Sequence, residues 1–491
     1  MTRDDLITRT GTVLLADPSR VVARLFVPGD ELLASGRSRA GAVVDRVLAL
    51  PDERAEALVA DVRARWGARH RDLDGVLDTT FSQIAHRVPD PDALDPVRRR
   101  LVASYFTQEQ SIEAAALFNP SLAPHPDQTG LRPGHLRVVM TLRAVGEGHV
   151  SCIEWRTGSV APDGAVRIDA PGAHAEVGTP GHAVHLRNRF AAGLRAAGAD
   201  SEAVAFLAAQ LPEEFHHDAL DRALVALEYS GLDRPDTPAT DELARHLARR
   251  DYEVEFPAAT ALAERVLRPH GPTESQGMED ARLVRFVADD GQVTYKATYT
   301  AFDGRQISPQ LVETTDLRRF RVSSLAGPAA VDKGMALFPR TVGGNHLALS
   351  RSDRETTGVT TSTDGWWWEP ATPLLRPSRS WDLVQTGNCG SPVETEAGWL
   401  VLTHGVGPMR EYAIGAVLLD LEDPTRVLGA LDEPLLRPRE DEREGYVPNV
   451  VYSCGPVRHG DVLVLPYGCS DAAVRFATVD LPALLERLSP G

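Results

Sequence analysis

The segment Trp399–Pro424, WLVLTHGVGPMREYAIGAVLLDLEDP, has the pattern of a β-hairpin followed by a turn. It begins with a short apolar strand, continues through glycine and polar residues, and returns in a second apolar strand. An acidic residue in a turn, Asp423-Pro424, ends it. Short apolar runs separated by turns that contain glycine and proline are typical of paired antiparallel strands. The segment therefore predicts one hairpin of a β-rich fold.

Four other segments of the chain repeat this pattern. They are His135–Gly158, Ala281–Phe320, Ala336–Trp368 and Asp461–Leu481. A repeat of roughly 40 to 60 residues suits the four-stranded blades of a propeller. A β-sandwich built from similar hairpins is the alternative, but five such units favour the propeller. We therefore expect a mainly β fold, a five-bladed β-propeller with added α-helical segments.

Two stretches have a helical periodicity instead. From about residue 40 to residue 110, apolar residues recur at i, i+3, i+4 and i+7 with charges between them. From about 181 to 267, short amphipathic segments are separated by Gly, Pro and Asp. We predict an N-terminal helical extension over residues 1–104 and a propeller domain over residues 105–491, with a helical insert at about 181–267. The insert lies between blade segments, so we expect it to cover the mouth of the channel.

The composition excludes several classes of protein. The formal net charge of -17 argues against nucleic acid or an anionic membrane as a partner, because both attract clustered cations. No run approaches the roughly 20 apolar residues of a membrane span, and the N-terminus lacks the basic start and apolar core of a signal peptide. The four cysteines, Cys152, Cys389, Cys454 and Cys469, have no metal-binding spacing. We therefore expect a soluble, cytoplasmic protein without a metal.

Short polar motifs are spread along the whole chain. Because the loops of a propeller converge at one end of its channel, motifs far apart in sequence can form one site. The motifs and their first residue numbers are FNPS 118, MTLR 140, GMEDAR 277, YTAFDGR 299, DKGMALFPR 332, GNCGSP 387, THGVGPMR 403, GYVPN 445 and YGCSD 467.

In this order, five segments resemble glycoside hydrolase family 130, the mannoside phosphorylases and mannosidases. Members of that family usually carry EDPR-like, YTA-aromatic, LFP, GWLxxxHGV and VPNVV segments. The corresponding residues here are Glu279–Arg282, Tyr299–Phe302, Leu337–Pro339, Gly398–Val406 and Val447–Val451. In the first segment, Ala281 stands where the pattern has proline.

The resemblance implies inverting cleavage of β-mannosidic bonds in short manno-oligosaccharides. The attacking group is phosphate in the phosphorylases, which release mannose 1-phosphate, and water in the β-mannosidases. Asp280 matches the general acid, which passes its proton to the glycosidic oxygen through the mannose 3-hydroxyl. Such an acid needs burial or a nearby carboxylate to hold its proton. Glu279 is adjacent, but strand alternation predicts that it points to the opposite face.

Sugar recognition needs polar groups for vicinal hydroxyls and aromatic faces for the C–H surface. Asn119, Arg143 and Asp471 resemble the family positions that bind mannose in the cleavage subsite. The candidate aromatic surfaces are Tyr299, Phe338 and Tyr446. The other substrate-binding candidates, all from the same motifs, are Glu279, Arg282, Asn388 and Asn449.

If the attacking group is phosphate, cations and hydroxyls must hold a dianion. The resemblance implies arginines, a lysine and a histidine for this role. His404 matches the histidine, and Arg305 falls near an arginine position. Gln385 stands where a lysine is expected and carries no charge. Lys333 or Arg351 can replace that lysine if the fold brings it to the site.

If the attacking group is water, a second carboxylate must activate it across the sugar ring. The candidate bases are Glu313, Glu442 and Glu444. Two other functions stay open, an inverting arabinanase- or furanosidase-like propeller hydrolase and a carbohydrate-binding propeller without catalysis. We expect a small oligosaccharide as the partner and no cofactor, with inorganic phosphate as co-substrate of a phosphorylase. The resemblance also implies a homo-oligomer.

Overall fold

The structure is a computed structural model that describes residues 6–29, 38–230 and 237–488. The chain divides into two compact units, which we call the β unit and the helical unit. The β unit comprises Met1–Ala16, Ala115–Pro171 and Val177–Gly491, and the helical unit comprises Asp17–Ala114 and Gly172–Glu176. The boundaries differ from the expected 1–104 and 105–491, because the first strand of the chain pairs with the last one and so belongs to the β unit.

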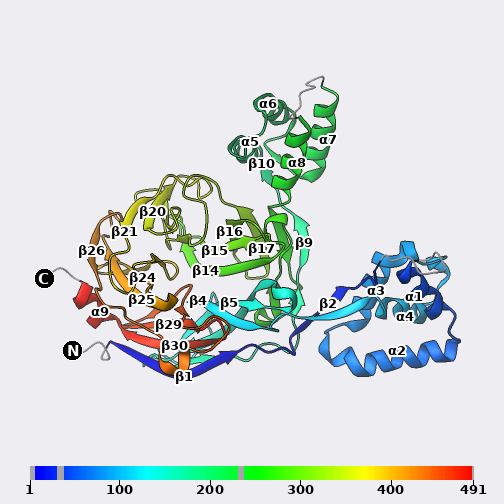
Figure 1. The fold of residues 1–491 in the computed structure, drawn as a ribbon, viewed down its shortest axis with the longest axis horizontal. Coiled ribbons are helices and arrows are strands. Elements are labelled where there is room, and N and C mark those ends of the chain that lie inside the picture. Colours follow the sequence, from blue (N-terminus) through cyan, green and yellow to red (C-terminus); the bar gives the residue numbers. More distant parts are fainter. Residues whose placement is uncertain (1–5, 30–37, 231–236, 489–491) are drawn as a thin grey trace. The chain divides into compact units, whose positions relative to one another are not determined.

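The largest sheet of the β unit combines two antiparallel meanders (Figure 1). They meet where Gly277 pairs in parallel with Ser151. The first meander contains β4 (Ala116–Pro124), β5 (Leu136–Val145) and β6 (Ser151–Val160), with β7 (Val166–Ile168) and β13 (Arg265–Leu267) beside β6. The second contains β14 (Gly277–Val287), β15 (Val293–Phe302), β16 (Ile307–Thr314) and β17 (Arg319–Ser324).

Three further sheets follow along the chain. The next sheet contains β18 (Ala336–Leu337), β19 (His346–Ser350), β20 (Thr357–Ser362) and β21 (Thr372–Leu375). The one after it contains β22 (Gln385–Asn388), β23 (Val393–Thr395), β24 (Gly398–Val406), β25 (Tyr412–Leu419) and β26 (Val427–Ala430). The hairpin expected in the segment Trp399–Pro424 is confirmed, since Trp399 of β24 pairs with Leu419 of β25.

The last sheet joins the two ends of the chain. It contains β27 (Val451–Tyr452), β28 (Val457–His459), β29 (Val462–Cys469), β30 (Ala473–Asp480) and β1 (Ile7–Leu15). Strand β1 runs antiparallel to β30, with Ile7 opposite Val479 and Leu15 opposite Ala473. Helix α9 (Leu481–Leu488) follows β30 directly. The N-terminal segment therefore completes the C-terminal sheet.

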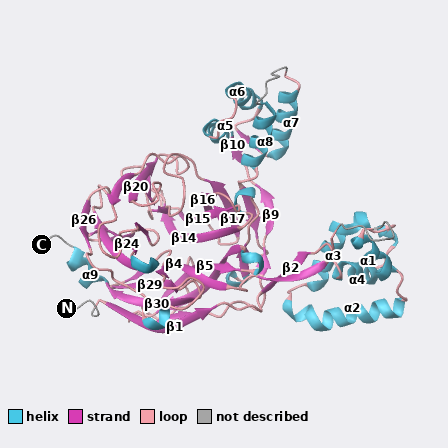
Figure 2. Cartoon of the chain, viewed as in Figure 1, coloured by secondary structure: helices cyan, strands magenta, loops and turns pink. Residues whose placement is uncertain are grey.

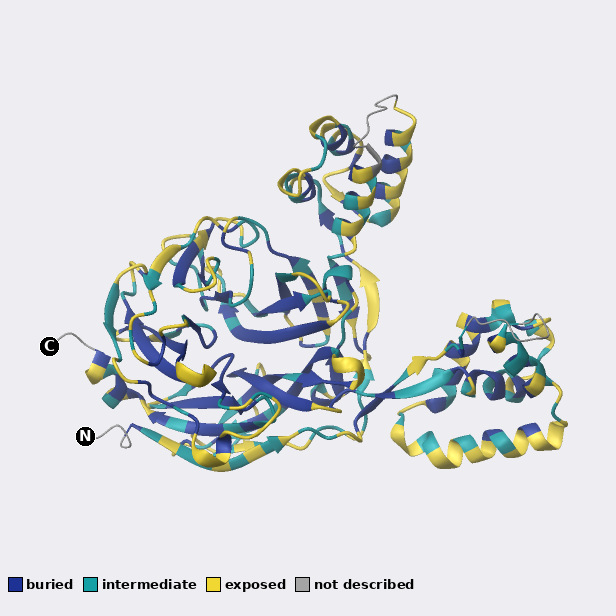
Figure 3. Cartoon of the chain, in the orientation of Figure 1, coloured by how far each residue is buried: buried dark blue, intermediate teal, exposed yellow. Residues whose placement is uncertain are grey.

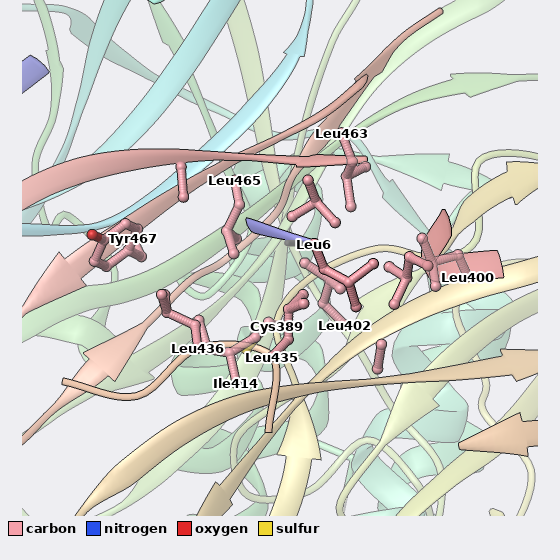
Figure 4. Packing of buried hydrophobic residues seen from close by; sticks show 14 of the residues in the cluster. Leu6, Cys389, Leu400, Leu402, Ile414, Leu435, Leu436, Leu463, Leu465 and Tyr467 are labelled. Atoms are coloured by element: carbon pink, nitrogen blue, oxygen red, sulfur yellow. The ribbon is translucent and has the colours of Figure 1, made fainter. Parts of the chain in front are cut away.

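Aliphatic side chains fill the space between neighbouring sheets. Figure 4 shows Leu400 and Leu402 of β24 beside Leu463 and Leu465 of β29, all of them buried. Ile414 of β25 belongs to the same cluster. In Figure 3, β24 and β14 are dark along most of their length, whereas the edge strand β9 is exposed. The mainly β class expected from the sequence is confirmed.

In its described residues, 17–29, 38–114 and 172–176, the helical unit contains four α-helices and a two-stranded antiparallel sheet. These are α1 (Arg39–Leu48), α2 (Asp52–Trp66), α3 (Leu73–Ile84), α4 (Pro96–Ser104), β2 (Val21–Leu25) and β3 (Thr107–Ser111). Ser38, Asp72 and Asp95 accept hydrogen bonds from the first free amides of α1, α3 and α4, which is the preferred way to begin a helix. Buried Val44, Leu77, Leu101 and Phe106 belong to its own core.

The helical insert is shorter than expected and lies at the outer edge of a sheet. Its helices are α5 (Arg187–Ala196), α6 (Ser201–Gln210), α7 (His217–Glu228) and α8 (Thr237–Ala248), joined by the short strands β10 (His185–Leu186) and β11 (Glu214–Phe215). Strands β9 (Thr179–His182) and β12 (Tyr252–Glu255) connect it to β17 (Figure 2). The last α-helix of the insert ends at Ala248, and β12, a 3₁₀ turn at Leu262–Glu264 and β13 follow it, so the helices end before the predicted limit of 267.

Two further properties concern the described residues. Within 6–29, 38–230 and 237–488, no helix is long and apolar enough to cross a membrane. In the same ranges, no group of three or more His, Cys, Asp or Glu side chains is arranged to hold a metal ion. The four cysteines are buried free thiols.

Candidate active site

One polar cavity of about 160 Å³ draws its walls from several sheets of the β unit. Its lining residues are Phe118, Asn119, Arg143, Asp280, Arg282, Lys333, Gly334, Arg351, Gln385, Gly387, Asn388, His404, Arg410, Tyr412, Val447, Val450, Tyr452 and Asp471. The strands that begin four of the sheet units, β4, β14, β22 and β27, each contribute to it. No residue of the described insert, 183–230 and 237–250, lines this cavity. The strands that connect the insert extend the outer edge of the sheet beyond β17, and the covering of the channel mouth by the insert stays a prediction.

Two β-bulges face one another at the centre of the cavity. The register of β4 shifts between Phe118 and Ser121, and that of β14 shifts between Glu279 and Arg282. Asn119 and Asp280 lie within these shifts and have left-handed backbones, with φ values of 49° and 57°. Such conformations cost about 1–3 kcal/mol each and are concentrated at functional sites. The amide of Asn119 donates to Oδ1 of Asp280 at 2.5 Å.

Three cationic side chains surround the carboxylate of Asp280. Arg143 donates from Nη1 to Oδ1 of Asp280 at 3.3 Å. Burial by itself raises the pKa of Asp280, but the charges of Arg143, Lys333 and Arg282 and the Asn119 hydrogen bond outweigh it. The pKa of Asp280 therefore lies below its ordinary value, and the carboxylate is ionised in the ligand-free protein.

Glu279 shares the cations of its neighbour. It accepts from Nη2 of Arg143 at 2.7 Å and from Nζ of Lys333 at 2.8 Å. The expectation that Glu279 points away from Asp280 is wrong, because the bulge interrupts the alternation of side chains along β14. Glu279 thus positions Arg143 and Lys333 beside Asp280.

His404 is a neutral hydrogen-bonding group in this cavity. Burial, followed by the charge of Arg351, lowers the pKa of His404 to about 3. Its Nδ1 lies 3.1 Å from the carbonyl oxygen of Asn388, and its Nε2 lies 3.4 Å from Nη1 of Arg351. The neutral ring therefore donates from Nδ1 to the carbonyl and accepts from Arg351 at Nε2. Nε of Arg351 is buried and has no partner among the described residues.

Aromatic and arginine side chains hold His404 in place. Tyr412 stacks on it with ring centroids 5.9 Å apart, and Tyr452 meets it edge-on at 4.9 Å. Arg282 donates to the Tyr452 hydroxyl at 2.7 Å and to the Asp280 carbonyl oxygen at 3.0 Å. A Cβ atom on Gly387 would lie 2.3 Å from Cε1 of His404, so only glycine fits there.

Asp471 is the second carboxylate of the lining, and it has a left-handed backbone with φ 52°. Burial, followed by the negative charge of Asp280, raises the pKa of Asp471 to about 6. The charges of Arg143 and Arg410 oppose this rise. The cavity therefore contains two carboxylates whose pKa values are shifted in opposite directions, a pattern typical of catalytic sites.

The structure brings eight of the predicted site residues into the lining and two more to its edge. Seven of these are Asn119, Arg143, Asp280, Arg282, Asn388, His404 and Asp471, and the predicted cation Lys333 is an eighth residue of the lining. Tyr446 and Asn449 flank the lining residue Val447 without lining the cavity themselves. Tyr446 is 58% exposed, and its hydroxyl lies 3.4 Å from Nδ1 of His149.

Two predicted aromatic surfaces are core residues. Tyr299 is 1% exposed, and its hydroxyl donates to Glu274. Phe338 is 0% exposed and packs edge-on against Trp399 with ring centroids 5.1 Å apart. Neither lines the cavity, so the prediction that they contact sugar is corrected, because packing between sheets occupies both rings.

The predicted phosphate ligand Arg305 and the three predicted bases lie elsewhere. Arg305 is exposed in the turn between β15 and β16. Glu313 pairs with Lys296 at 3.0 Å, and Glu444 is exposed. Glu442 is buried, but Arg9 and the Tyr467 hydroxyl occupy its oxygens at 2.8–3.2 Å. None of the four lines the cavity, so these assignments are corrected.

Sequence reasoning left several lining residues without an assigned role. Tyr412 and Tyr452 follow the THGVGPMR and GYVPN motifs by a few positions, and Arg410 ends the first of them. Arg351 follows β19, outside any of the motifs. Of the four, Arg351 alone was named, as a possible substitute for the lysine. Proximity to a motif was therefore the available signal for the other three.

Comparisons with known proteins agree with the motifs. The model of the family Glyco_hydro_130, described as β-1,4-mannooligosaccharide phosphorylase, matches residues 253–489. A 1,2-β-oligomannan phosphorylase of Thermoanaerobacter sp. (strain X514) is 32% identical over 212 residues, which are 42% of this chain and 70% of the relative. A β-1,2-mannobiose phosphorylase of Listeria innocua is 31% identical over 231 residues, 45% of this chain and 63% of the relative.

A solved structure of β-1,2-mannobiose phosphorylase from Listeria innocua, in complex with β-1,2-mannobiose, is also similar. It aligns with a TM-score of 0.45 and 22% identity over 77% of this chain and 93% of that chain. The sequence match to the Thermoanaerobacter relative, together with the family model, is the decisive finding. The chain therefore belongs to glycoside hydrolase family 130 and is an enzyme of the β-mannoside-cleaving kind that its motifs indicated.

Proposed function

We propose that the β unit is the catalytic domain of a β-mannoside phosphorylase that releases mannose 1-phosphate. The surplus of cations in the cavity carries this proposal. Five permanently charged side chains line it, Arg143, Arg282, Lys333, Arg351 and Arg410. Asp280 and Asp471 are the carboxylates in the described lining. A surplus of this kind suits a phosphate dianion, which arginine and lysine bind through charge-assisted hydrogen bonds.

In the proposed reaction, a phosphate oxygen attacks C1 of the mannose while the bond from C1 to the glycosidic oxygen breaks. Lys333 and Arg351 hold the phosphate, and the unpartnered Nε of Arg351 supplies a free donor. Asp280 gives its proton to the mannose 3-hydroxyl, which passes one to the leaving oxygen. The products are mannose 1-phosphate and an oligosaccharide shorter by one mannose.

Phosphate binding also solves the protonation of Asp280. In the ligand-free protein, nearby cations keep the pKa of Asp280 below its ordinary value, which is unsuitable for an acid. A bound dianion neutralises the charges of Lys333 and Arg351 and adds negative charge nearby, so it raises that pKa. Asp280 therefore carries its proton only when phosphate is bound.

We assign Asn119, Arg143 and Asp471 to the mannose that is transferred, since they line the cavity beside Asp280. For the linkage, we propose β-1,2. Both sequence relatives described above are named for 1,2-β bonds, whereas the family model is named for β-1,4 bonds. Hydrolysis is the second candidate, because Asp471 is a carboxylate in the cavity that can activate water once it is ionised.

For the architecture, we propose that the sheets form the five blades of a propeller. The support is the sequence of five antiparallel meanders, with β1 completing the last of them. In Figure 1 the sheets of the β unit follow one another around a common centre. That the substrate is a small oligosaccharide is part of the proposed function. The homo-oligomer and the cytoplasmic location stay predictions from the sequence.

The test is product analysis of β-1,2-mannobiose incubated with and without inorganic phosphate. We expect mannose 1-phosphate and mannose in equal amounts, formed only with phosphate. Free mannose at equal rates in both reactions would overturn phosphorolysis in favour of hydrolysis through Asp471. β-1,4-Mannobiose serves as the comparison substrate, and faster turnover of it would overturn the assigned linkage.

A further inference from the structure

A second cavity, of about 300 Å³, lies between the helical insert and the outer part of the sheet that carries it. Helix α5 contributes Arg189 and Phe190, and the segment after α8 contributes Arg250 and Asp251. Strand β17 contributes Arg321. No residue lines both this cavity and the active-site cavity. Its volume is at the lower end of the range of about 300–1,000 Å³ that is typical of small-molecule sites.

Polar groups with unused hydrogen-bonding capacity line this cavity. His185 is 5% exposed, and its Nε2 has no partner among the described residues. Nε of Arg250 is buried and equally unpartnered within the described part of the chain. Buried polar atoms are nearly always paired, so these two atoms are available to hydrogen-bond a ligand that enters the cavity.

The carboxylates of the cavity already have other partners. Asp251 accepts from the amide and the hydroxyl of Ser324 at 2.8 and 2.6 Å. Glu313 pairs with Lys296 at 3.0 Å. No ion pair joins Arg250 to a carboxylate in the described residues, and Arg321 donates to a backbone carbonyl, that of Val184, at 3.2 Å. Asp251 also lies 4.0 Å from Nδ1 of His185, and Arg189 pairs with Asp364 at 3.2 Å. Arg250 and Arg321 remain as cations beside Asp251, so the lining has a small positive surplus, which suits an anion.

We propose that this cavity is a second, non-catalytic site that binds a monosaccharide phosphate. Arg250, Arg321 and His185 hold the phosphate group. Leu186, Phe190, Leu247 and Leu325 form an apolar wall that faces the C–H surface of the sugar ring. Trp366 also lines the cavity and adds an aromatic surface of the kind that sugars pack against. The insert thereby gains a role that its distance from the active site does not otherwise suggest.

The test is isothermal titration calorimetry of the full chain with mannose 1-phosphate, glucose 6-phosphate and inorganic phosphate. To remove phosphate binding at the active site, the background carries Lys333→Ala and Arg351→Ala. We expect one remaining site, which prefers a sugar phosphate to inorganic phosphate. Arg250→Gln weakens that site at least about 10-fold, as loss of a hydrogen bond to a charged group does.

Two further variants keep the result interpretable. Arg249→Gln is the matched control, since Arg249 is exposed and does not line this cavity; it leaves binding unchanged. Ala196→Phe fills the cavity from an exposed position on α5 and abolishes binding without removing a charge. Unchanged binding in both Arg250→Gln and Ala196→Phe, or equal affinity for inorganic phosphate, overturns the proposal. The measurement needs no turnover, so it is independent of the proposed reaction.

Discussion

Two buried carboxylates in the β unit, Asp280 and Glu442, have opposite kinds of surroundings. Glu442 is 1% exposed, and its oxygens accept from Arg9, from the Tyr467 hydroxyl and from the amide of Arg439. It lines neither of the two cavities described above. Arg9 and Arg475 both form ion pairs with it, at 3.1 and 3.9 Å, and its hydrogen-bonding capacity is used, so the group has nothing left to offer a ligand.

Asp280 is 9% exposed and also contacts an arginine. However, its backbone is left-handed and it lines a cavity that has a surplus of cations. Burial and an arginine partner are therefore common to a structural carboxylate and a catalytic candidate. Unbalanced charge beside empty space separates the two. The same criterion distinguishes Glu313, which its lysine neutralises, from Asp471, which forms no ion pair within the described part of the chain.

The largest expected effect is on turnover. Asp280→Asn keeps the shape and the hydrogen bond to Asn119 but cannot donate a proton. General acid catalysis is worth about 100- to 10,000-fold, so we expect kcat with β-1,2-mannobiose and phosphate to fall by that factor. Circular dichroism and thermal unfolding of the variant check that it folds. Activity within a factor of ten of the unmodified enzyme contradicts the role of Asp280 as the acid.

For Glu442 we expect the opposite result: its substitution lowers the free energy of unfolding and leaves kcat unchanged. Glu442→Ala removes the carboxylate partner of Arg9 and of the Tyr467 hydroxyl and weakens the link between β1 and the loop before β27. Removing one member of a buried ion pair costs about 3–5 kcal/mol, and we expect that loss in urea unfolding at neutral pH. Once corrected for the folded fraction, kcat stays unchanged.

The matched control for this variant is Glu444→Ala, an exposed position in the same loop. Surface substitutions of this kind change stability by less than about 0.5 kcal/mol. A large loss of kcat in folded Glu442→Ala, with Glu444→Ala unaffected, would show that Glu442 takes part in catalysis and that the comparison drawn above is wrong.

The strands and the acid could be predicted from the sequence because their signals are local. Each hairpin is a continuous pattern of apolar runs and turns, and Asp280 is part of a recognisable motif. The position of Glu279 could not be predicted, because the bulge that turns it toward Arg143 depends on the pairing of β14 with β15. Alternation along one strand carries no information about such a shift.

The partners of the acid depend on contacts between distant segments. Arg351 and Tyr452 reach the cavity because separate sheets converge, and no spacing in the chain reports that convergence. Arg305 was misplaced for the same reason. It follows the YTAF segment closely, but the turn that holds it is exposed and away from the cavity. A carboxylate such as Glu442 is misread when its partner, Arg9, is 433 positions away.

A smaller effect is expected at the phosphate-binding side of the cavity. Lys333→Ala removes a charge-assisted hydrogen bond worth about 1.5–3 kcal/mol, so KM for phosphate rises about 10- to 150-fold. KM for the mannoside changes much less. Lys296 is the other lysine of the chain and pairs with Glu313 outside the cavity, which makes Lys296→Ala the control. Equal phosphate KM in the two variants contradicts phosphate binding by Lys333.

The smallest effect concerns the pH dependence of stability. The pKa of Asp471 is about 6 in the folded protein, against an ordinary value of 3.8. The folded state therefore holds this proton more tightly, and the stability that it contributes is present below about pH 4 and lost as the pH rises through about 6. Asp471→Asn cannot titrate. We expect its unfolding free energy, relative to that of the unmodified protein, to increase between pH 4 and pH 7, as measured by urea unfolding.

Asp280→Asn sharpens the same measurement, because the charge of Asp280 is one cause of the raised pKa of Asp471. With that charge removed, the pKa of Asp471 falls toward its ordinary value, so the pH-dependent loss of stability becomes smaller and ends at lower pH. In the double variant Asp280→Asn/Asp471→Asn, position 471 does not titrate, so the pH-dependent loss of stability due to Asp471 is absent. If the stability of Asp471→Asn instead runs parallel to that of the unmodified protein at every pH, the two carboxylates are not coupled. Asp471 would then belong with Glu442, among the buried carboxylates whose charge is already balanced.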